Sequence, residues 1–127
     1  MSGTRAKILV MDDDAELLDT ASRLLEPQFE VLTYRAAFNR LNVVRDFQPD
    51  LILMDVNMPL VPGDEVTRLL KDSPELSDIP VVLFSSNDER SLKRLARECG
   101  AVGYISKSEM GWNFSSHVAR QLAAIRR

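Results

Sequence analysis

Short apolar runs alternate along the chain with longer segments in which apolar residues recur every three or four positions. The runs have the length and composition of buried strands, and the recurring positions form one face of a helix. The runs lie at residues 7–11, 30–34, 51–55, 80–85 and 104–106. The periodic segments lie at residues 17–25, 37–44, 64–70, 92–99 and 114–125. This alternation of strands and helices predicts an α/β domain with a parallel sheet.

The ends of the expected helices carry residues that stop a helix. Pro27 and Pro49 follow the first two helices, and Gly100 suits the left-handed cap of the fourth. The residues expected on the buried sides of the later helices, or to anchor the last one, are Ala37, Phe38, Leu41, Val44, Val66, Leu69, Leu70, Leu92, Leu95, Ala96, Cys99, Trp112 and Phe114.

The fold that this pattern favours is a doubly wound, five-stranded parallel sheet with helices on both faces. The run at 51–55 is apolar almost throughout, as a strand buried on both faces should be. We expect the flavodoxin-like strand order 2-1-3-4-5, which is taken from other five-stranded doubly wound folds and not from the sequence. All of residues 1–127 are expected to form this single domain.

Composition and charge limit the classes of protein that fit. The formal net charge is −3 and the pI about 5.2, which argues against a general nucleic-acid surface. The apolar stretches are far shorter than the roughly 20 residues of a membrane span, and the N-terminus lacks a signal-peptide pattern. One cysteine, Cys99, cannot form an internal disulfide. We therefore expect a cytoplasmic protein without a membrane or nucleic-acid partner.

Carboxylates end two of the apolar runs. Asp12, Asp13 and Asp14 follow the first run, and Asp55 ends the third. The carboxyl ends of neighbouring parallel strands meet at one edge of the sheet, where open α/β sheets bind ligands. Carboxylates crowded there repel one another unless a hard cation joins them, and Mg²⁺ prefers oxygen ligands. The sequence therefore predicts an acidic Mg²⁺ site at this edge.

Two further strand ends add a hydroxyl and an ammonium group. Ser85 ends the fourth run, and Lys107 follows the fifth. A hydrogen-bond donor and a point charge beside bound Mg²⁺ suit a phosphoryl group. Since a carboxylate can act as the nucleophile, the set is compatible with an aspartyl-phosphate.

The chain resembles, over essentially its whole length, the receiver domain of bacterial two-component response regulators. The matching segments are Ile8-Leu9-Val10-Met11-Asp12-Asp13-Asp14, Pro49-Asp50-Leu51-Ile52-Leu53-Met54-Asp55-Val56-Asn57-Met58-Pro59, Ile79-Pro80-Val81-Val82-Leu83-Phe84-Ser85-Ser86, and Gly100-Ala101-Val102-Gly103-Tyr104-Ile105-Ser106-Lys107. Each segment alone is a modest signal, whereas all four in this order and spacing are specific.

The resemblance implies a phosphoacceptor and a metal site. Asp55 corresponds to the phosphoacceptor, and Asp13 to the direct Mg²⁺ ligand. Asp12 is expected to act partly through water, and the main-chain carbonyl of Asn57 to complete the protein's ligands. The domain would then catalyse its own phosphorylation and the slow hydrolysis of the product.

The resemblance also implies a switch and partners. Ser85 corresponds to the switch hydroxyl, Lys107 to the phosphate-pairing lysine, and Tyr104 to the aromatic residue that turns inward on activation. The expected phosphodonor is a sensor histidine kinase or a phosphotransfer protein. The surface of the fourth helix, fifth strand and fifth helix would then change its protein partners, and the domain would be a monomer or weak dimer.

The chain departs from the usual receiver pattern at three places. Receivers usually have proline after the lysine, with a cis peptide bond, where this chain has Lys107-Ser108. A cis bond before a residue other than proline costs about 2.5–4 kcal/mol, so we expect a trans bond, which puts the reach of Lys107 in question. Pro62 replaces the common aspartate before Gly63, and Ser85 the usual threonine.

Two alternatives remain open at this stage. A phosphohydrolase of the haloacid dehalogenase type also uses an aspartate nucleophile, and Asp12-x-Asp14 superficially fits its first motif. However, Glu16 stands where that motif has threonine or valine. The other alternative is a pseudo-receiver that keeps the fold and acts only as a docking or dimerisation module, and the changes at Pro62 and Ser108 keep this alternative open.

Overall fold

The computed structural model describes residues 5–35 and 38–126. Its strands are β1 (Lys7–Met11), β2 (Glu30–Tyr34), β3 (Leu51–Asp55), β4 (Val81–Ser85) and β5 (Gly103–Ser106). Its helices are α1 (Ala15–Leu25), α2 (Arg40–Phe47), α3 (Gly63–Asp72), α4 (Glu89–Cys99) and α5 (Phe114–Ile125), with a short 3-10 helix, η1 (Lys107–Glu109).

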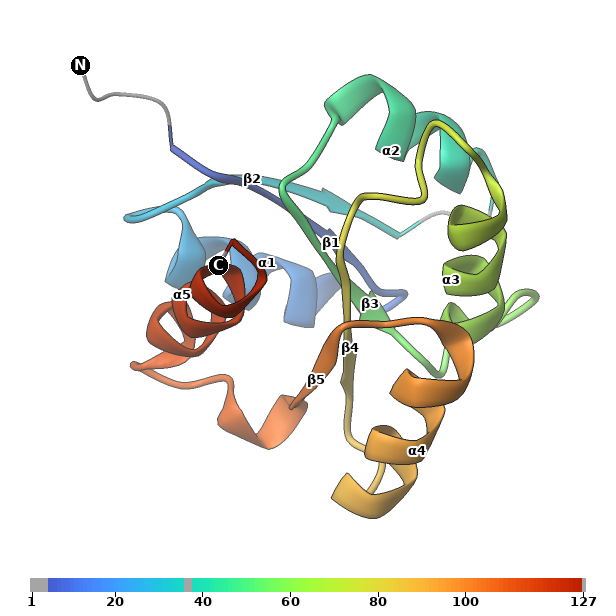
Figure 1. Ribbon diagram of the computed structural model, residues 1–127. Coiled ribbons are helices and arrows are strands. Elements are labelled where there is room, and N and C mark those ends of the chain that lie inside the picture. The colour runs from blue at the N-terminus through green and yellow to red at the C-terminus, as the bar shows by residue number, and fades with distance from the viewer. Residues whose placement is uncertain (1–4, 36–37, 127) are drawn as a thin grey trace.

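The five strands form one parallel sheet in the order β2-β1-β3-β4-β5, which confirms the predicted topology (Figure 1). Met11 of β1 pairs with Met54 of β3, and Asp55 pairs with Phe84 of β4. This register brings the residues that follow β1 next to Asp55. The edge predicted to hold the site is therefore formed by the carboxyl ends of β1, β3, β4 and β5.

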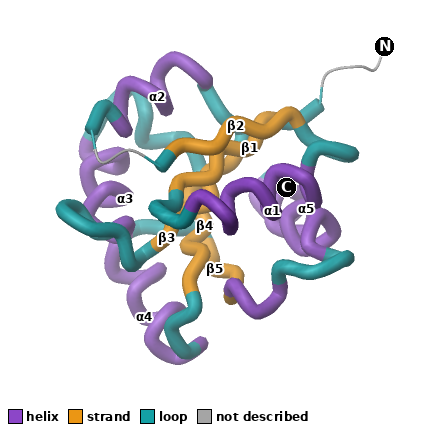
Figure 2. Tube along the Cα trace, turned by 180° about the vertical axis from the view of Figure 1, so that it is seen from behind, coloured by secondary structure: helices purple, strands orange, loops and turns teal. Residues whose placement is uncertain are grey.

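Helices cover both faces of the sheet, with α1 and α5 on one face and α2, α3 and α4 on the other (Figures 1 and 2). Side chains alternate between the two faces along each strand. Ile8 and Val10 of β1 pack in the core beneath α1 and α5, whereas Leu9 and Met11 pack in the core beneath α2, α3 and α4. Burial on both faces explains why β3 is apolar up to Asp55.

Three residues expected to be buried are exposed. Phe38, Leu69 and Trp112 are 72%, 51% and 92% exposed, respectively. Phe38 precedes α2, which begins only at Arg40, so it does not lie on the helix face. Ala37, expected on the same face, lies outside the described residues. Trp112 lies in the loop before α5, and Phe114 alone anchors the start of that helix in the core.

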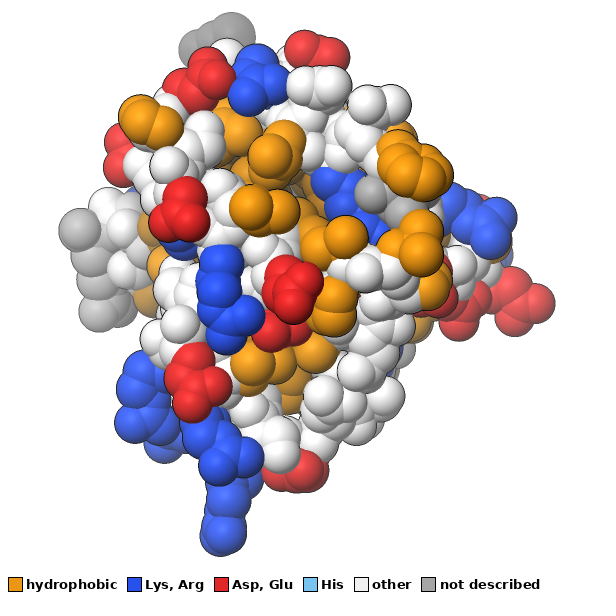
Figure 3. All heavy atoms as spheres, turned by 90° about the vertical axis from the view of Figure 1, so that its right-hand side faces the viewer, with side chains coloured by type: hydrophobic (Ala, Val, Ile, Leu, Met, Phe, Trp, Pro, Cys, Tyr) orange, Lys and Arg blue, Asp and Glu red, His pale blue; other side chains and the backbone are white. Residues whose placement is uncertain are grey.

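Leu69 is exposed because α3 turns Thr67 toward the sheet. Thr67 is buried between Val66 and Leu70, and its hydroxyl donates to the Gly63 carbonyl at 2.8 Å. This hydrogen bond satisfies the buried hydroxyl, so a polar residue can lie on the buried side of the helix. Figure 3 shows the face that carries α2, α3 and α4, where apolar side chains reach the surface among polar ones.

Within residues 5–35 and 38–126, no helix has both the length and the apolar character needed to cross a membrane.

Candidate functional site

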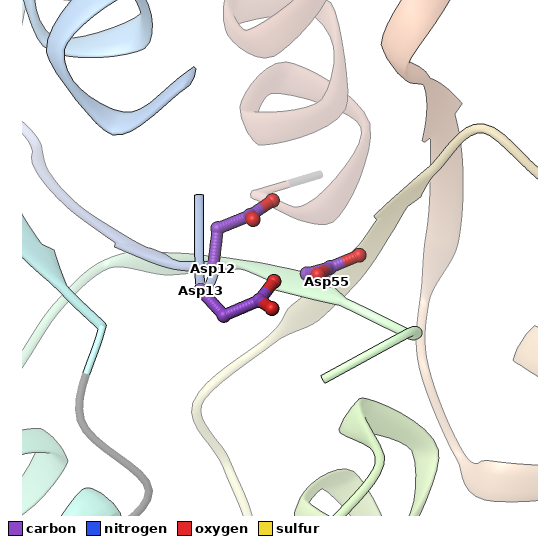
Figure 4. A group of neighbouring side chains, drawn as sticks. All are labelled: Asp12, Asp13 and Asp55. Atoms are coloured by element: carbon purple, nitrogen blue, oxygen red, sulfur yellow. The ribbon is translucent and has the colours of Figure 1, made fainter. Parts of the chain in front are cut away.

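The three aspartates after β1 have different environments. Asp12 is buried, and its Oδ1 accepts a hydrogen bond from the Asp14 amide at 3.0 Å. Asp13 is exposed and points toward Asp55 (Figure 4). Asp14 is the N-cap of α1, where its Oδ1 accepts hydrogen bonds from the amides of Glu16 and Leu17. Asp12 and Asp13 therefore belong to the site, while Asp14 is committed to the helix.

Asp55 lies at the end of β3 and is almost completely buried. Its Oδ1 accepts hydrogen bonds from the Asn57 amide at 3.2 Å and from Lys107 Nζ at 3.1 Å. The start of α3 presses against its backbone, since a Cβ atom on Gly63 would collide with the Asp55 carbonyl. A glycine is required at that position, so α3 packs on the Asp55 backbone while Lys107 and the Asn57 amide bind one oxygen of its carboxylate.

Lys107 reaches the carboxylates although its peptide bond to Ser108 is trans, as are all the peptide bonds of the described residues. The expectation of a trans bond is therefore confirmed, and the doubt about the reach of Lys107 is removed. The chain turns at once into η1, where Ser106 and Glu109 form a capping box. Ser106 Oγ accepts from the Ser108 amide at 3.3 Å, so local capping shapes the turn that follows the lysine.

Ser85 and Asn57 are linked across the site. Ser85 is buried at the end of β4, and its Oγ accepts hydrogen bonds from Asn57 Nδ2 at 3.2 Å and from the Asn87 amide at 3.1 Å. Asn57 Nδ2 also donates to Asn87 Oδ1 at 2.9 Å. The sequence predicts a role for Asn57 through its main-chain carbonyl only, and it does not predict Asn87. Asn87 could have been found from its position two residues beyond the end of a strand, the same spacing that separates Asn57 from Asp55.

The buried carboxylates and Lys107 alter one another's protonation. Burial raises the pKa of the Asp55 carboxyl above its usual range, and the nearby Asp12 carboxylate adds to this rise, against the opposite effects of Lys107 and the Asn57 amide. Burial alone would lower the pKa of the Lys107 ammonium. Its contacts with Asp12 and Asp55 outweigh burial, so this pKa is raised and the lysine stays charged.

The donor set fits a hard divalent cation. Asp12, Asp13 and Asp55 each offer one carboxylate oxygen, and these oxygens lie within 4.8 Å of one another (Figure 4). Asp12 Oδ2 is buried and accepts no hydrogen bond from a backbone amide or a neutral side chain of the described residues. Lys107 Nζ lies 2.8 Å from this oxygen as an ion pair. Three oxygen donors with one lysine leave excess negative charge, which is the environment that Mg²⁺ requires.

Tyr104 lies apart from these residues. Its hydroxyl donates to Glu89 Oε1 at 3.0 Å, which joins β5 to the first turn of α4. This contact raises the pKa of the Tyr104 phenol, mainly because the Glu89 carboxylate accepts the phenolic hydrogen. The structure thus brings together six of the seven residues singled out from the sequence, and places the expected switch aromatic toward α4.

Residues 8–116 of the chain match the family described as response regulator receiver domain. The chain is 33% identical to the polar-differentiation response regulator DivK of Brucella ovis over 104 residues, which cover 82% of this chain and 85% of that protein. It is 30% identical to protein RcaC of Microchaete diplosiphon over 94% of its own length, but spans only 19% of RcaC. The chemotaxis response regulator CheY4 of Vibrio cholerae has the same fold, with a TM-score of 0.82, 22% identity, and coverage of 94% of this chain and 99% of CheY4.

Proposed function

Because the chain belongs to the family of response regulator receiver domains, we propose that it is a signalling switch that takes a phosphoryl group onto Asp55 with the help of Mg²⁺. The observation that carries the proposal is the contact of Lys107 Nζ with both buried carboxylates, at 2.8 Å from Asp12 and 3.1 Å from Asp55. A cation held between two carboxylates at a strand edge suits the transfer of an anionic group.

The carboxylate of Asp55 is the nucleophile of the proposed reaction. Its Oδ1 is engaged by Lys107 and the Asn57 amide, and its Oδ2 receives no hydrogen bond from the described residues. We assign Oδ2 to the attack on phosphorus, while the bond from phosphorus to the donor breaks and its electron pair leaves with the donor. Mg²⁺ held by Asp12, Asp13, Asp55 and the Asn57 carbonyl would neutralise charge on the phosphoryl oxygens.

Ser85 is suited to form a hydrogen bond with the phosphoryl group once it is on Asp55. In this structure its Oγ accepts two hydrogen bonds, and no described residue accepts its hydroxyl hydrogen. That hydrogen can be donated to a phosphoryl oxygen on Asp55, which would draw the loop after β4 toward the site. Tyr104 would then exchange its contact with Glu89 for an inward position.

The expected partners follow from the family. The phosphodonor would be a sensor histidine kinase or a phosphotransfer protein, and the output surface would be α4, β5 and α5. Basic side chains lie exposed along α4, and Figure 3 shows Lys and Arg side chains at the lower end of the molecule, where α4 lies. They are Arg90, Lys93, Arg94 and Arg97. A cytoplasmic location and a monomeric or weakly dimeric state stay predictions.

Intact mass after incubation with a small acyl phosphate tests the proposal. The wild-type protein should gain one phosphoryl group with Mg²⁺ and none with a chelator. Asp55→Ala should gain none, whereas Ser85→Ala should still be phosphorylated because its hydroxyl does not form the new bond. A Mg²⁺-dependent gain of wild-type extent in Asp55→Ala would show that the site is wrongly assigned.

The alternatives are less well supported. The dehalogenase-type reading needs Asp14 in the site, and the carboxylate of Asp14 is committed to capping α1. The pseudo-receiver reading drew on Ser108, and Lys107 contacts both carboxylates in spite of the change. A lack of phosphorylation in the mass experiment would favour the pseudo-receiver.

A further inference from the structure

Arg40 is a buried charged residue without a role in the proposed reaction. Among the described residues, the buried charged side chains are Asp12, Asp55 and Arg40, and two of these belong to the site. Arg40 is the first residue of α2 and is only 6% exposed. Burying a guanidinium is unfavourable unless polar partners compensate for the lost water. Its position therefore calls for a specific explanation.

The guanidinium of Arg40 holds the loop that follows Asp55. Its Nη1 donates to the Val61 carbonyl at 2.8 Å, a contact between residues 21 positions apart. Val61 belongs to the β3–α3 loop, residues 56–62, which leads from Asp55 to Gly63 and carries Asn57. The contact joins α2 to the loop that carries Asn57. The carbonyl of Asn57 is a predicted metal ligand, and its side chain donates a hydrogen bond to Ser85.

The backbone of this loop is strained at the residue next to the contact. Leu60 has a φ of 73°, in the left-handed region that is unfavourable for a residue with a Cβ atom. Such a conformation persists only where the surroundings impose it. The Leu60 side chain is 75% exposed and supplies little packing, so the restraint comes from hydrogen bonds to the backbone on either side of it. The bonds that supply it are Arg40 to Val61, Val61 to Pro59, and Gly63 to Val56.

Arg40 also stands as a fixed positive charge near the acidic cluster. Burial lowers the pKa of its guanidinium, whereas the proximity of Tyr34 and Asp13 acts in the opposite direction. An arginine stays protonated despite such a shift. Asp13 is a predicted metal ligand, so this charge adds to that of Lys107 in offsetting the acidic cluster.

We propose that Arg40 is a positioning residue of the phosphorylation site, which holds the β3–α3 loop in the strained conformation that places Asn57 beside Asp55 and Ser85. The inference rests on the proposed function, because the groups that it positions are those of the metal and phosphoryl site. The residue acts through the loop and touches neither the phosphorus nor Asp55.

Hydrogen exchange of the metal-free protein tests the restraint directly. Arg40→Met keeps a long side chain in the same space and removes the donor. Amides of residues 57–63 should exchange about threefold or more faster than in wild type, while those of β4 stay unchanged, because the lost bond to Val61 restrains this loop and not β4. Arg45→Met is the matched control, since Arg45 lies on the same helix and bonds Glu75 instead of the loop.

Phosphorylation at saturating Mg²⁺ tests whether the restraint serves the site. The rate with a small acyl phosphate should fall roughly three- to tenfold in Arg40→Met and remain at the wild-type value in Arg45→Met, since small displacements of reacting groups slow a reaction strongly. If the wild type itself is not phosphorylated, the proposed function fails. If the wild type is phosphorylated and Arg40→Met matches it, only the role of Arg40 fails.

A second variant keeps the test decisive if Arg40→Met does not fold. Arg40→Lys retains the charge but replaces the planar guanidinium by a single ammonium group. Faster loop exchange together with a reduced rate in either variant supports the assignment. Wild-type exchange in residues 57–63, or faster exchange with an unchanged rate, overturns it and leaves Arg40 a structural residue.

Discussion

Lys107, directly after β5, reaches across β4 to Asp55 at the end of β3, with its Nζ 3.1 Å from Asp55 Oδ1. The same Nζ pairs with Asp12 after β1. One side chain therefore compensates two buried carboxylates that come from different strands. Its place between them makes Lys107 a structural counter-ion as well as a candidate for pairing with the phosphoryl group.

Lys107→Met should destabilise the metal-free protein, because Asp12 and Asp55 would remain buried without their counter-ion. Removing one partner of a buried ion pair costs up to about 3–5 kcal/mol. Mg²⁺ should restore part of this loss, so the variant should gain more stability from Mg²⁺ than wild type does. Urea unfolding with chelator and with Mg²⁺ measures both effects. An equal Mg²⁺ gain in the two proteins would contradict this prediction.

Asp55→Asn should be more stable than wild type at neutral pH without metal. Burial, and then Asp12, raise the pKa of Asp55 in the folded protein above its unfolded value. A raised folded pKa means that the wild type loses free energy of unfolding as the pH rises through it. The amide does not titrate, so the advantage of the variant should grow from acid to neutral pH. A gain of 1 kcal/mol would raise the Tm by roughly 3–5 °C.

Urea unfolding of both proteins in chelator, at several pH values between acid and neutral, measures this difference. Effects of other titrating groups are shared and cancel between wild type and variant. If the stability advantage of Asp55→Asn over wild type is largest at acid pH, the pKa of Asp55 is not raised in the folded protein.

Asp13→Asn should bind Mg²⁺ more weakly by roughly tenfold or more, because affinity depends on the number of charged oxygen ligands. Asp14→Asn is the matched control. The Asp14 side chain caps α1, and asparagine caps helices equally well. Calorimetric titration of Mg²⁺ should show weaker binding for the first variant and wild-type binding for the second. Equal affinity of Asp13→Asn and wild type would refute the metal site.

Gly63→Ala should destabilise the protein by about 1–3 kcal/mol, as overpacking a tight contact does. The added Cβ would lie 2.9 Å from Met54 Cγ and collide with the Asp55 carbonyl. Gly111→Ala is the control, since its Cβ would meet no atom within 4 Å. Urea unfolding compares the two, and an equal effect would argue against close packing of α3 on Asp55.

Glu89→Gln should lower the pKa of Tyr104 toward its ordinary value. The Glu89 carboxylate accepts the phenolic hydrogen, which raises that pKa in the wild type, and the neutral amide accepts it more weakly. Titration of tyrosine rings followed by NMR separates Tyr104 from Tyr34. An unchanged Tyr104 titration would mean that the contact with Glu89 does not persist in solution.

The order of the elements and the strand ends that carry chemistry follow from local patterns in the sequence. Apolar runs and helical periodicity are local properties, so β1, β3 and β4 were located to within one residue. Parallel strands then require Asp12, Asp55 and Ser85 to meet at one edge, whatever the loops do. The candidate site was therefore predictable as soon as the strands were.

Packing in three dimensions selects which neighbouring residues lie together in the site. Asp13 faces the site while Asp14 caps α1, because the helix begins at the residue that follows Asp14. Asn87 and Arg40 reach the site region through contacts with residues that lie 21 to 30 positions away along the chain. Such contacts depend on how each helix is rotated and how each loop is restrained. No pattern along the sequence encodes these quantities, because they arise from packing among all the elements at once.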